Sequence, residues 1–343
     1  YVEAMRLYRI AADRGENAAP NSIGILYFQG NGVERNYLEA MKWYRVAAGN
    51  GNQFAMRNIA LLYEDGKGVA KDHSEAFRWF NQAAGKNESD AQNSVGIYYE
   101  NGWGVEKNLV QASLWYLKAA EQGNSNAQYN LAMLFKNGNG FKEDLKQAIK
   151  WFRLAAEQGD MDSLFELGQM HNYGRGVRKD YKEAMRWYRA AAEKGHAGSQ
   201  SNIGVLYELG NGVPLDFIEA AKWYRLSSAQ NNAVATSNLG AIYEDGRGIS
   251  RDDDEAFRLY KLSASQGGSD GQHYLGSMYE DGRGTEKNYV MAYMWFQVSA
   301  ESGNSDADEK RKNIQKRMTD DQIEKAKKIA TQCIAKDYHN CDQ

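Results

Sequence analysis

The chain has 343 residues, of which 42% are hydrophobic and 25% charged, and its formal net charge is -3. So small a net charge creates no strong field for nucleic acid or anionic lipid, and we expect no nucleic-acid partner. No stretch of about 18 apolar residues occurs, so we also expect no membrane-spanning helix.

Residues 1–15 are predicted to form the second helix of a truncated repeat. Leu7 stands in the position that Trp43 occupies 36 residues later. Because the sequence starts within a repeat, we expect that a signal peptide has been removed or lies upstream.

Residues 16–303 follow a strict period of 36 residues. Its clearest marker is a Gly-x-Gly pair that recurs eight times, at Gly30/Gly32, Gly66/Gly68, Gly102/Gly104, Gly138/Gly140, Gly174/Gly176, Gly210/Gly212, Gly246/Gly248 and Gly282/Gly284. A fixed period of this length is typical of a stacked repeat array. We therefore predict eight repeats in one continuous all-α solenoid, whose long surface is the site of function.

Each repeat is predicted to be a pair of helices. In residues 52–87, apolar residues at helical spacing define a first helix, which ends at Gly66 because glycine tolerates positive φ. Asp72 then caps a second helix, and Glu75 three residues later suggests a capping box. The cap column contains only Asn and Asp, at Asn36, Asp72, Asn108, Asp144, Asp180, Asp216, Asp252 and Asn288.

Two further columns suggest how the helices pack. Small residues in the first helix let helices approach closely, at Gly24, Ala60, Gly96, Ala132, Gly168, Gly204, Gly240 and Gly276. Large residues in the second helix are expected to fill the space between units, at Trp43, Trp79, Trp115, Trp151, Trp187, Trp223, Leu259 and Trp295.

Together these residues resemble the Sel1-like repeat, a relative of the tetratricopeptide repeat. The pattern is Ala-x-x-x-Leu-Gly-x-x-Tyr, then Gly-x-Gly-Val, then Asp-x-x-x-Ala-x-x-Trp-Tyr-x-x-Ala-Ala-x-x-Gly. Residues 124–159 match it at Ala127, Leu131, Ala132, Phe135, Gly138, Gly140, Asp144, Ala148, Trp151, Phe152, Ala155, Ala156 and Gly159. The resemblance covers residues 1–303 and implies a right-handed α/α superhelix that binds other proteins without catalysis.

Charged residues also form rows. An acidic row near the end of the first helix reads Glu64, Glu100, Glu208, Glu244 and Glu280, and a basic row on the second helix reads Lys42, Arg78, Lys150, Arg186, Lys222 and Arg258. Such rows are most often solvated faces with weak ion pairs between units. The alternative is an electrostatic strip that selects a charged partner.

The columns in which the repeats differ are the better guide to function. In the first helix these are the columns of Arg57 and Leu61, four residues apart and so on one face. By analogy with tetratricopeptide arrays, this face lines a concave groove. Large side chains gather in the central repeats, at Ile97, Trp103, Tyr129, Met133 and Phe165. Such side chains are typical binding anchors, although they also fill gaps between helices.

The fifth repeat departs from the pattern at His171, which replaces a Tyr or Phe, and at Tyr173 beside Gly174. A histidine in such a column is most often satisfied within the packing. The alternative is a polar contact within the groove, with a pH-sensitive His171, because free histidine titrates near pH 6.5.

Residues 304–343 lose the period and are predicted to form capping helices. The only cysteines, Cys333 and Cys341, lie eight residues apart here. This spacing allows either a disulfide that closes a short loop or two reduced thiols. The tail resembles the ends of exported bacterial Sel1-like proteins, which favours the disulfide. A zinc site is not expected, because His339 is the only nearby histidine.

No catalytic constellation emerges, because the five histidines fall in unrelated columns and no Gly-Lys-Ser/Thr follows the glycine pairs. We therefore expect no enzyme activity, cofactor or metal. We expect a monomer, secreted or periplasmic in a bacterium. Its groove would bind an extended peptide or helix of a host factor, as the resemblance to host-entry proteins of the LpnE type implies. The alternatives are an envelope or signalling adaptor, a regulatory subunit or domain of an enzyme complex, and a peptidoglycan hydrolase.

Overall fold

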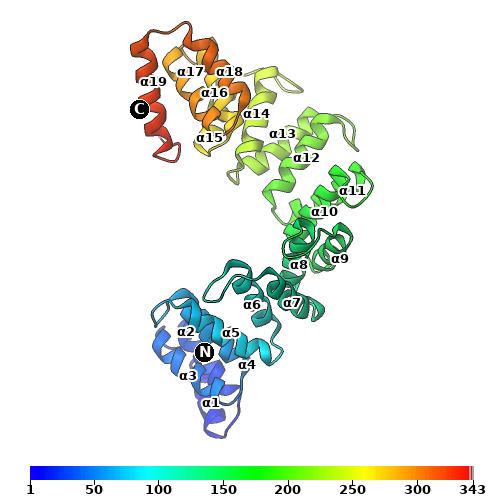
Figure 1. Ribbon diagram of the computed structural model, residues 1–343, viewed down its shortest axis with the longest axis vertical. Coiled ribbons are helices and arrows are strands. Elements are labelled where there is room, and N and C mark those ends of the chain that lie inside the picture. Colours follow the sequence, from blue (N-terminus) through cyan, green and yellow to red (C-terminus); the bar gives the residue numbers. More distant parts are fainter. Residues whose placement is uncertain (340, 342–343) are drawn as a thin grey trace. The chain divides into compact units, whose positions relative to one another are not determined.

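The computed structural model describes residues 1–339 and 341, and this part of the chain consists of α-helices joined by short turns, without strands (Figure 1). First helices of the repeats are α2 (Ala19–Gln29), α4 (Gln53–Asp65), α6 (Ser89–Asn101), α8 (Ser125–Asn137), α10 (Met161–Tyr173), α12 (Ala197–Leu209), α14 (Ala233–Asp245), α16 (Ser269–Asp281) and α18 (Ser305–Gln315). Second helices are α1 (Val2–Asp13), α3 (Tyr37–Gly49), α5 (His73–Gly85), α7 (Leu109–Glu121), α9 (Leu145–Glu157), α11 (Tyr181–Glu193), α13 (Phe217–Ser228), α15 (Asp253–Ser265) and α17 (Tyr289–Glu301). The last helix is α19 (Asp320–Ile334).

The chain divides into two compact units, Tyr1–Ser163 and Leu164–Gln343, with the boundary inside α10. Seven first helices pack against the second helix of their own repeat and against that of the preceding repeat, namely α2, α4, α6 and α8 in the first unit and α12, α14 and α16 in the second. In the first unit, for example, α4 contacts both α5 and α3. Each unit is therefore a stretch of an all-α repeat solenoid.

The predicted caps of the second helices are confirmed. From α3 to α17, the side chain of each Asn or Asp in the cap column accepts a hydrogen bond from a backbone N–H of the first turn. This arrangement satisfies amide groups that the helix itself leaves free. The cap column therefore sets the start of the second helices from α3 to α17.

The capping box predicted at Asp72 and Glu75 is wrong. The side chain of Glu75 does not accept a hydrogen bond from the backbone N–H of Asp72. It forms an ion pair with Arg78, three residues later in the same helix. Four other pairs follow the same rule, namely Glu39–Lys42, Glu183–Arg186, Glu219–Lys222 and Glu255–Arg258. These five members of the basic row are thus paired on their own helix, not between units.

The Gly-x-Gly turn connects the two helices of one repeat and packs against the second helix of the preceding repeat. Gly102 ends α6 with a φ of 75°, and its N–H donates to the carbonyl of Tyr98. Gly104, with a φ of 62°, lies against the start of α5, where a Cβ atom would be 2.4 Å from the backbone carbon of His73. The same contact with the preceding second helix recurs at Gly32, Gly68, Gly140, Gly212, Gly248 and Gly284. Only glycine fits a left-handed backbone pressed against another backbone.

The centre of each repeat is an aromatic ring placed on a small residue. The rings follow the tryptophan column by one residue and are almost fully buried, at Tyr44, Phe80, Tyr116, Phe152, Tyr188, Tyr224, Tyr260 and Phe296. A Cβ atom on Gly96 would lie 2.6 Å from the ring of Tyr116. Within the tryptophan column, Trp151 and Trp295 are buried, whereas the other tryptophans are half-buried. The tyrosine and phenylalanine column is therefore the main filler of the core.

The C-terminal helices cover the end of the second unit (Figure 1). Helix α19 begins with a complete capping box between Thr319 and Gln322 and packs against α17. Its buried residues, Ile323, Ala326 and Ala330, belong to the hydrophobic cluster that contains α17.

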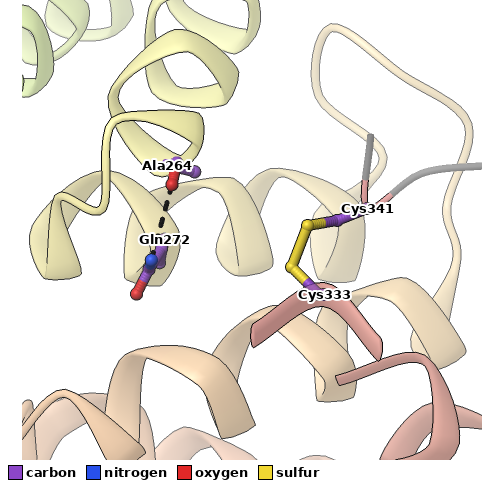
Figure 2. The surroundings of a disulfide bond; sticks show 4 residues. All are labelled: Ala264, Gln272, Cys333 and Cys341. Carbon is purple, nitrogen blue, oxygen red and sulfur yellow. Dashed lines mark hydrogen bonds between the residues drawn. A yellow bond between two sulfur atoms is a disulfide. The ribbon is translucent and has the colours of Figure 1, made fainter. Parts of the chain in front are cut away.

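The two cysteines lie close together at the end of α19 and just beyond it. The sulfur atoms of Cys333 and Cys341 lie 1.97 Å apart, at bonding distance (Figure 2). Between them in sequence, Tyr338 packs against Gly267, where a Cβ atom would be 3.3 Å from the tyrosine ring. Because Gly267 lies between α15 and α16, this short loop contacts the junction of those helices.

Candidate protein-binding face

The two variable columns of the first helices form what we call the first-helix face. In the first unit it consists of Asn21, Ile25, Arg57, Leu61, Asn93, Ile97, Tyr129 and Met133. In the second unit it consists of Phe165, Gln169, Ser201, Val205, Ser237, Ala241, His273 and Ser277. Ile25 of α2 and Leu61 of α4 line one pocket, and Asn130 of α8 donates to Asn93 of α6 at 3.0 Å. Neighbouring first helices thus meet along this face.

Three predicted anchors lie on the first-helix face of the first unit. Ile97 on α6 and Tyr129 and Met133 on α8 are half-buried. The centroid of the Tyr129 ring is 5.9 Å from that of Phe152, on the second helix of the same repeat. Tyr129 therefore packs within its own repeat as well as lining the face.

Trp103 is the most exposed of the anchors predicted in this unit, with 41% of its surface accessible. It lies in the turn after α6, stacks on His73 at a centroid distance of 5.5 Å and meets Tyr98 edge-on at 5.8 Å. The hydroxyl of Tyr98 donates to Glu64 at 2.9 Å. Trp103 thus belongs to an aromatic cluster at the joint between two repeats.

The remaining predicted site residues lie on α10, in the second unit. The ring of Phe165 is half-buried, 4.6 Å from the ring of His196 and 6.0 Å from that of Tyr188. His171 is only 8% exposed, whereas Tyr173 is 63% exposed. Burial makes His171 inaccessible to a partner and favours its packing role, while Tyr173 is open to solvent.

The acidic row is half-buried and is not the solvated face expected from sequence, whereas the expected ion pairs between units are present in part. Glu100 accepts a hydrogen bond from the hydroxyl of buried Tyr116 at 2.6 Å, and burial followed by this bond raises the pKa of Tyr116. The same bond occurs at Tyr224–Glu208 and Tyr260–Glu244. Two of these carboxylates also pair with an arginine of the next repeat, in Glu208–Arg247 and Glu244–Arg283. The row therefore stabilises the stacking of the repeats.

Sequence reasoning missed a column of buried glutamines. Gln128, only 4% exposed, donates to the carbonyl of Ala120 at 3.1 Å and accepts from Gln158 at 2.8 Å. Gln272 similarly donates to the carbonyl of Ala264 (Figure 2). These bonds satisfy buried polar groups where one repeat meets the next. The recurrence of glutamine at Gln92, Gln128, Gln200 and Gln272 was the available signal.

His273 on α16 is expected to make stability depend on pH. Burial, and then the charge of Lys310, lowers the pKa of His273. Below about pH 6.5 the unfolded chain therefore binds a proton that the folded chain resists, so stability falls as the pH falls. We expect the unfolding free energy of the native chain to decrease between pH 7.5 and 5.5 relative to His273→Asn, measured by urea titration. Parallel curves for the two proteins would contradict this.

Within residues 1–339 and 341, no group of three or more His, Cys, Asp or Glu side chains is arranged to hold a metal ion. In the same part of the chain, no helix has both the length and the apolar character needed to cross a membrane.

Helix pairs of constant length, joined by recurring turns and caps, define the class of α-helical repeat proteins. The profile of the Sel1 repeat matches the chain at residues 1–16, 21–52, 53–87, 89–124, 125–160, 162–196, 197–232, 233–268 and 269–304. The chain therefore belongs to the Sel1 repeat family, as the sequence pattern predicted.

Solved structures agree with this assignment. A protective antigen present in uropathogenic Escherichia coli strains, which displays an SLR fold, is 31% identical with a TM-score of 0.90, over 99% of this chain and 73% of that one. A Sel1 repeat protein from Oxalobacter formigenes is 28% identical with a TM-score of 0.70, over 90% of each chain. No curated protein matches the chain. Sel1 repeat proteins generally mediate protein–protein interactions and are typically non-catalytic.

Proposed function

We propose that this chain is a non-catalytic, monomeric scaffold of an exported bacterial protein, and that it binds a host protein through the first-helix face. One observation carries the proposal: within each unit, the columns that vary most between repeats lie on one face of the first helices. The cap, glycine, aromatic and glutamine columns make the recurring contacts that build the array. The side chains of the variable columns are not needed for these recurring contacts, so they can determine which partner binds.

The anchors supply the chemistry that protein interfaces use. Ile97 and Met133 contribute apolar surface that is half-buried before any partner arrives, and Trp103 and Tyr173 are exposed aromatic side chains. Methionine and aromatic residues are enriched at interfaces and often dominate their binding energy. A preformed helical surface also loses little conformational entropy on association.

Two observations support export. Disulfides persist in oxidising compartments such as the periplasm or the extracellular space, and Cys333 and Cys341 lie at bonding distance. The antigen from uropathogenic Escherichia coli aligns with 99% of this chain. An exported protein of this kind meets host proteins directly.

The test is affinity capture from host-cell lysates and, in parallel, from bacterial envelope extracts, with quantification by mass spectrometry. The variant Ile97→Gln/Met133→Gln removes apolar surface while using a residue that Gln169 already places in this column. Tyr129 and Phe165 are left intact because their rings pack within their own repeats. The control is Leu114→Gln, an exposed position on the second helix α7.

We expect a host protein that is captured by the native chain and by Leu114→Gln, and that is depleted at least tenfold with the double variant. Circular dichroism should show equal helicity for all three proteins. A partner lost only with Leu114→Gln would place binding on the second helices and contradict the first-helix face. Capture only from envelope extracts would replace the host partner with an envelope protein.

A further inference from the structure

A pocket of about 230 Å³ opens on the first-helix face of the first unit. It lies between α2 and α4, and its base is Tyr44 of α3, which is 2% exposed. The other lining residues are Ile25, Phe28, Gln29, Asn58 and Leu61, so no carboxylate, ammonium or guanidinium group lines it.

The hydroxyl of Tyr44 has lost the acceptor that its counterparts use. In three other repeats this tyrosine donates to a glutamate sixteen residues before it, as Tyr116 does to Glu100 at 2.6 Å. Sixteen residues before Tyr44 stands Phe28, which cannot accept the bond. No described residue forms a hydrogen bond with the Tyr44 hydroxyl.

The position of that hydroxyl follows from the repeat. The ring of Tyr44 packs against Gly24, and a Cβ atom added to Gly24 would lie 2.5 Å from this ring. The same distance separates the ring of Tyr188 from a Cβ atom added to Gly168, and the ring of Tyr224 from one added to Gly204. The hydroxyl of Tyr44 therefore points toward the column of Phe28, and Phe28 and Tyr44 line the same pocket. The Tyr44 hydroxyl is not among the buried polar atoms that lack a partner, so water can reach it, and an acceptor on a ligand would take the place of that water.

We propose that this pocket binds one uncharged apolar side chain of a peptide segment, with a backbone carbonyl of that segment accepting a hydrogen bond from the Tyr44 hydroxyl. The inference deepens the proposed function and rests on it, because it assigns the pocket as a specificity subsite for the partner protein.

Size and charge both select this occupant. The volume is below the about 300–1,000 Å³ of small-molecule sites, which suits a single side chain rather than a drug-sized ligand or a helix. Ile25, Phe28 and Leu61 supply apolar walls that favour leucine, isoleucine, methionine or phenylalanine. No charged group lines the pocket, so a charged side chain would be desolvated there. The ammonium of Lys67 lies 5.5 Å from the centroid of the Phe28 ring, but it is already paired with Asp65 at 2.7 Å.

The test uses the full chain with isotope-labelled Ile and Leu methyl groups. N-acetyl-leucine methylamide is titrated to millimolar concentration while NMR follows the methyl signals of Ile25 and Leu61. N-acetyl-glutamate methylamide is the charged comparison. Tyr44→Phe removes only the hydroxyl, and Phe28→Glu restores the internal acceptor; both substitutions use residues already present in the same columns, at Phe80 and Glu64. Tyr116→Phe is the control, since that hydroxyl has an internal partner.

We expect saturable shifts at both methyl groups with the leucine probe and none with the glutamate probe. Tyr44→Phe should weaken binding about two- to tenfold, the effect of one neutral hydrogen bond. Phe28→Glu should abolish binding, and Tyr116→Phe should leave it unchanged. If the native chain showed no shifts, or if Phe28→Glu bound the leucine probe as well as the native chain does, the proposed binding site would be contradicted. The leucine probe binds without a partner protein, so the two experiments are independent. The pocket proposal can be contradicted while a host protein is captured, and the pocket can bind the probe while no host protein is captured.

Discussion

Replacing Gly96 with alanine is expected to lower the free energy of unfolding by about 1–3 kcal/mol, the usual cost of overpacking a core. The loss is expected although alanine favours a helix over glycine by about 1 kcal/mol. The reason is steric, because a Cβ atom at this position would lie 2.6 Å from the ring of Tyr116. The ring cannot withdraw, since its hydroxyl is held by Glu100 at 2.6 Å. Urea unfolding monitored by circular dichroism measures the change.

A second substitution should reverse much of this loss. In the tyrosine and phenylalanine column, every tyrosine faces a glycine. Where the small residue is alanine, the ring is a phenylalanine, in the pairs Ala60/Phe80 and Ala132/Phe152. Tyr116→Phe releases the ring from Glu100, so the double variant Gly96→Ala/Tyr116→Phe should be more stable than the two single losses predict. We expect a coupling energy of about 1 kcal/mol or more, within the range for residues in direct contact.

Gly49→Ala is the matched control, because this helical glycine has no atom within 4 Å of an added Cβ. It should leave stability unchanged or slightly increased. Equal losses for Gly96→Ala and Gly49→Ala, or strict additivity in the double variant, would contradict the proposed contact between ring and glycine.

Gly104→Ala is expected to have the larger effect, a loss of about 2–5 kcal/mol from left-handed strain and overpacking combined. The residue has a φ of 62°, and a Cβ atom would lie 2.4 Å from the backbone carbon and oxygen of His73. A helix backbone cannot yield as a flexible side chain can. The variant should therefore separate two neighbouring repeats, and hydrogen exchange should locate the weakened joint at α5 and α6.

Gly123→Ala distinguishes the two causes of this loss. Gly123 also has a positive φ, of 87°, but an added Cβ atom would meet nothing within 4 Å. Only the backbone strain remains, so the expected loss is about 1–2 kcal/mol. If both variants lost the same stability, the contact between the turn and His73 would contribute nothing.

Local signals made much of the fold predictable. A cap such as Asn108 depends on a side chain and the first turn of one helix, and Gly102 depends on the backbone of one turn. Both are therefore readable from a single repeat. The period then extends each local assignment to the whole array, which explains why the helix pairs and the family could be recognised from sequence.

Contacts between helices were harder to predict. Glu100 stands near a helix end, where a carboxylate normally faces solvent, and only the stacking brings it to Tyr116. Gln128 has the polarity of a surface residue, yet it is buried because two backbones meet around it. The capping box at Asp72 failed because Arg78 competes for the same carboxylate. In each case the deciding partner lies on another turn or another helix.

The candidate site was predictable in part. The period of 36 residues places Ile25 and Leu61 at the same position of neighbouring first helices, and the two side chains line a common pocket. Burial could not be inferred from spacing, and it divides the predicted residues into exposed Tyr173 and buried His171. The pocket itself had a sequence signal, because Phe28 interrupts the acidic column.

The central claim is that the first-helix face binds a protein, and site-specific photo-crosslinking tests it most directly. The crosslinking amino acid p-benzoylphenylalanine is placed at Met133 on α8 or, as a control, at Leu114 on α7, and each protein is irradiated in the host lysate. We predict that one host protein is attached covalently at position 133 and not at position 114. Attachment only at position 114, or no protein adduct at position 133, would contradict the account.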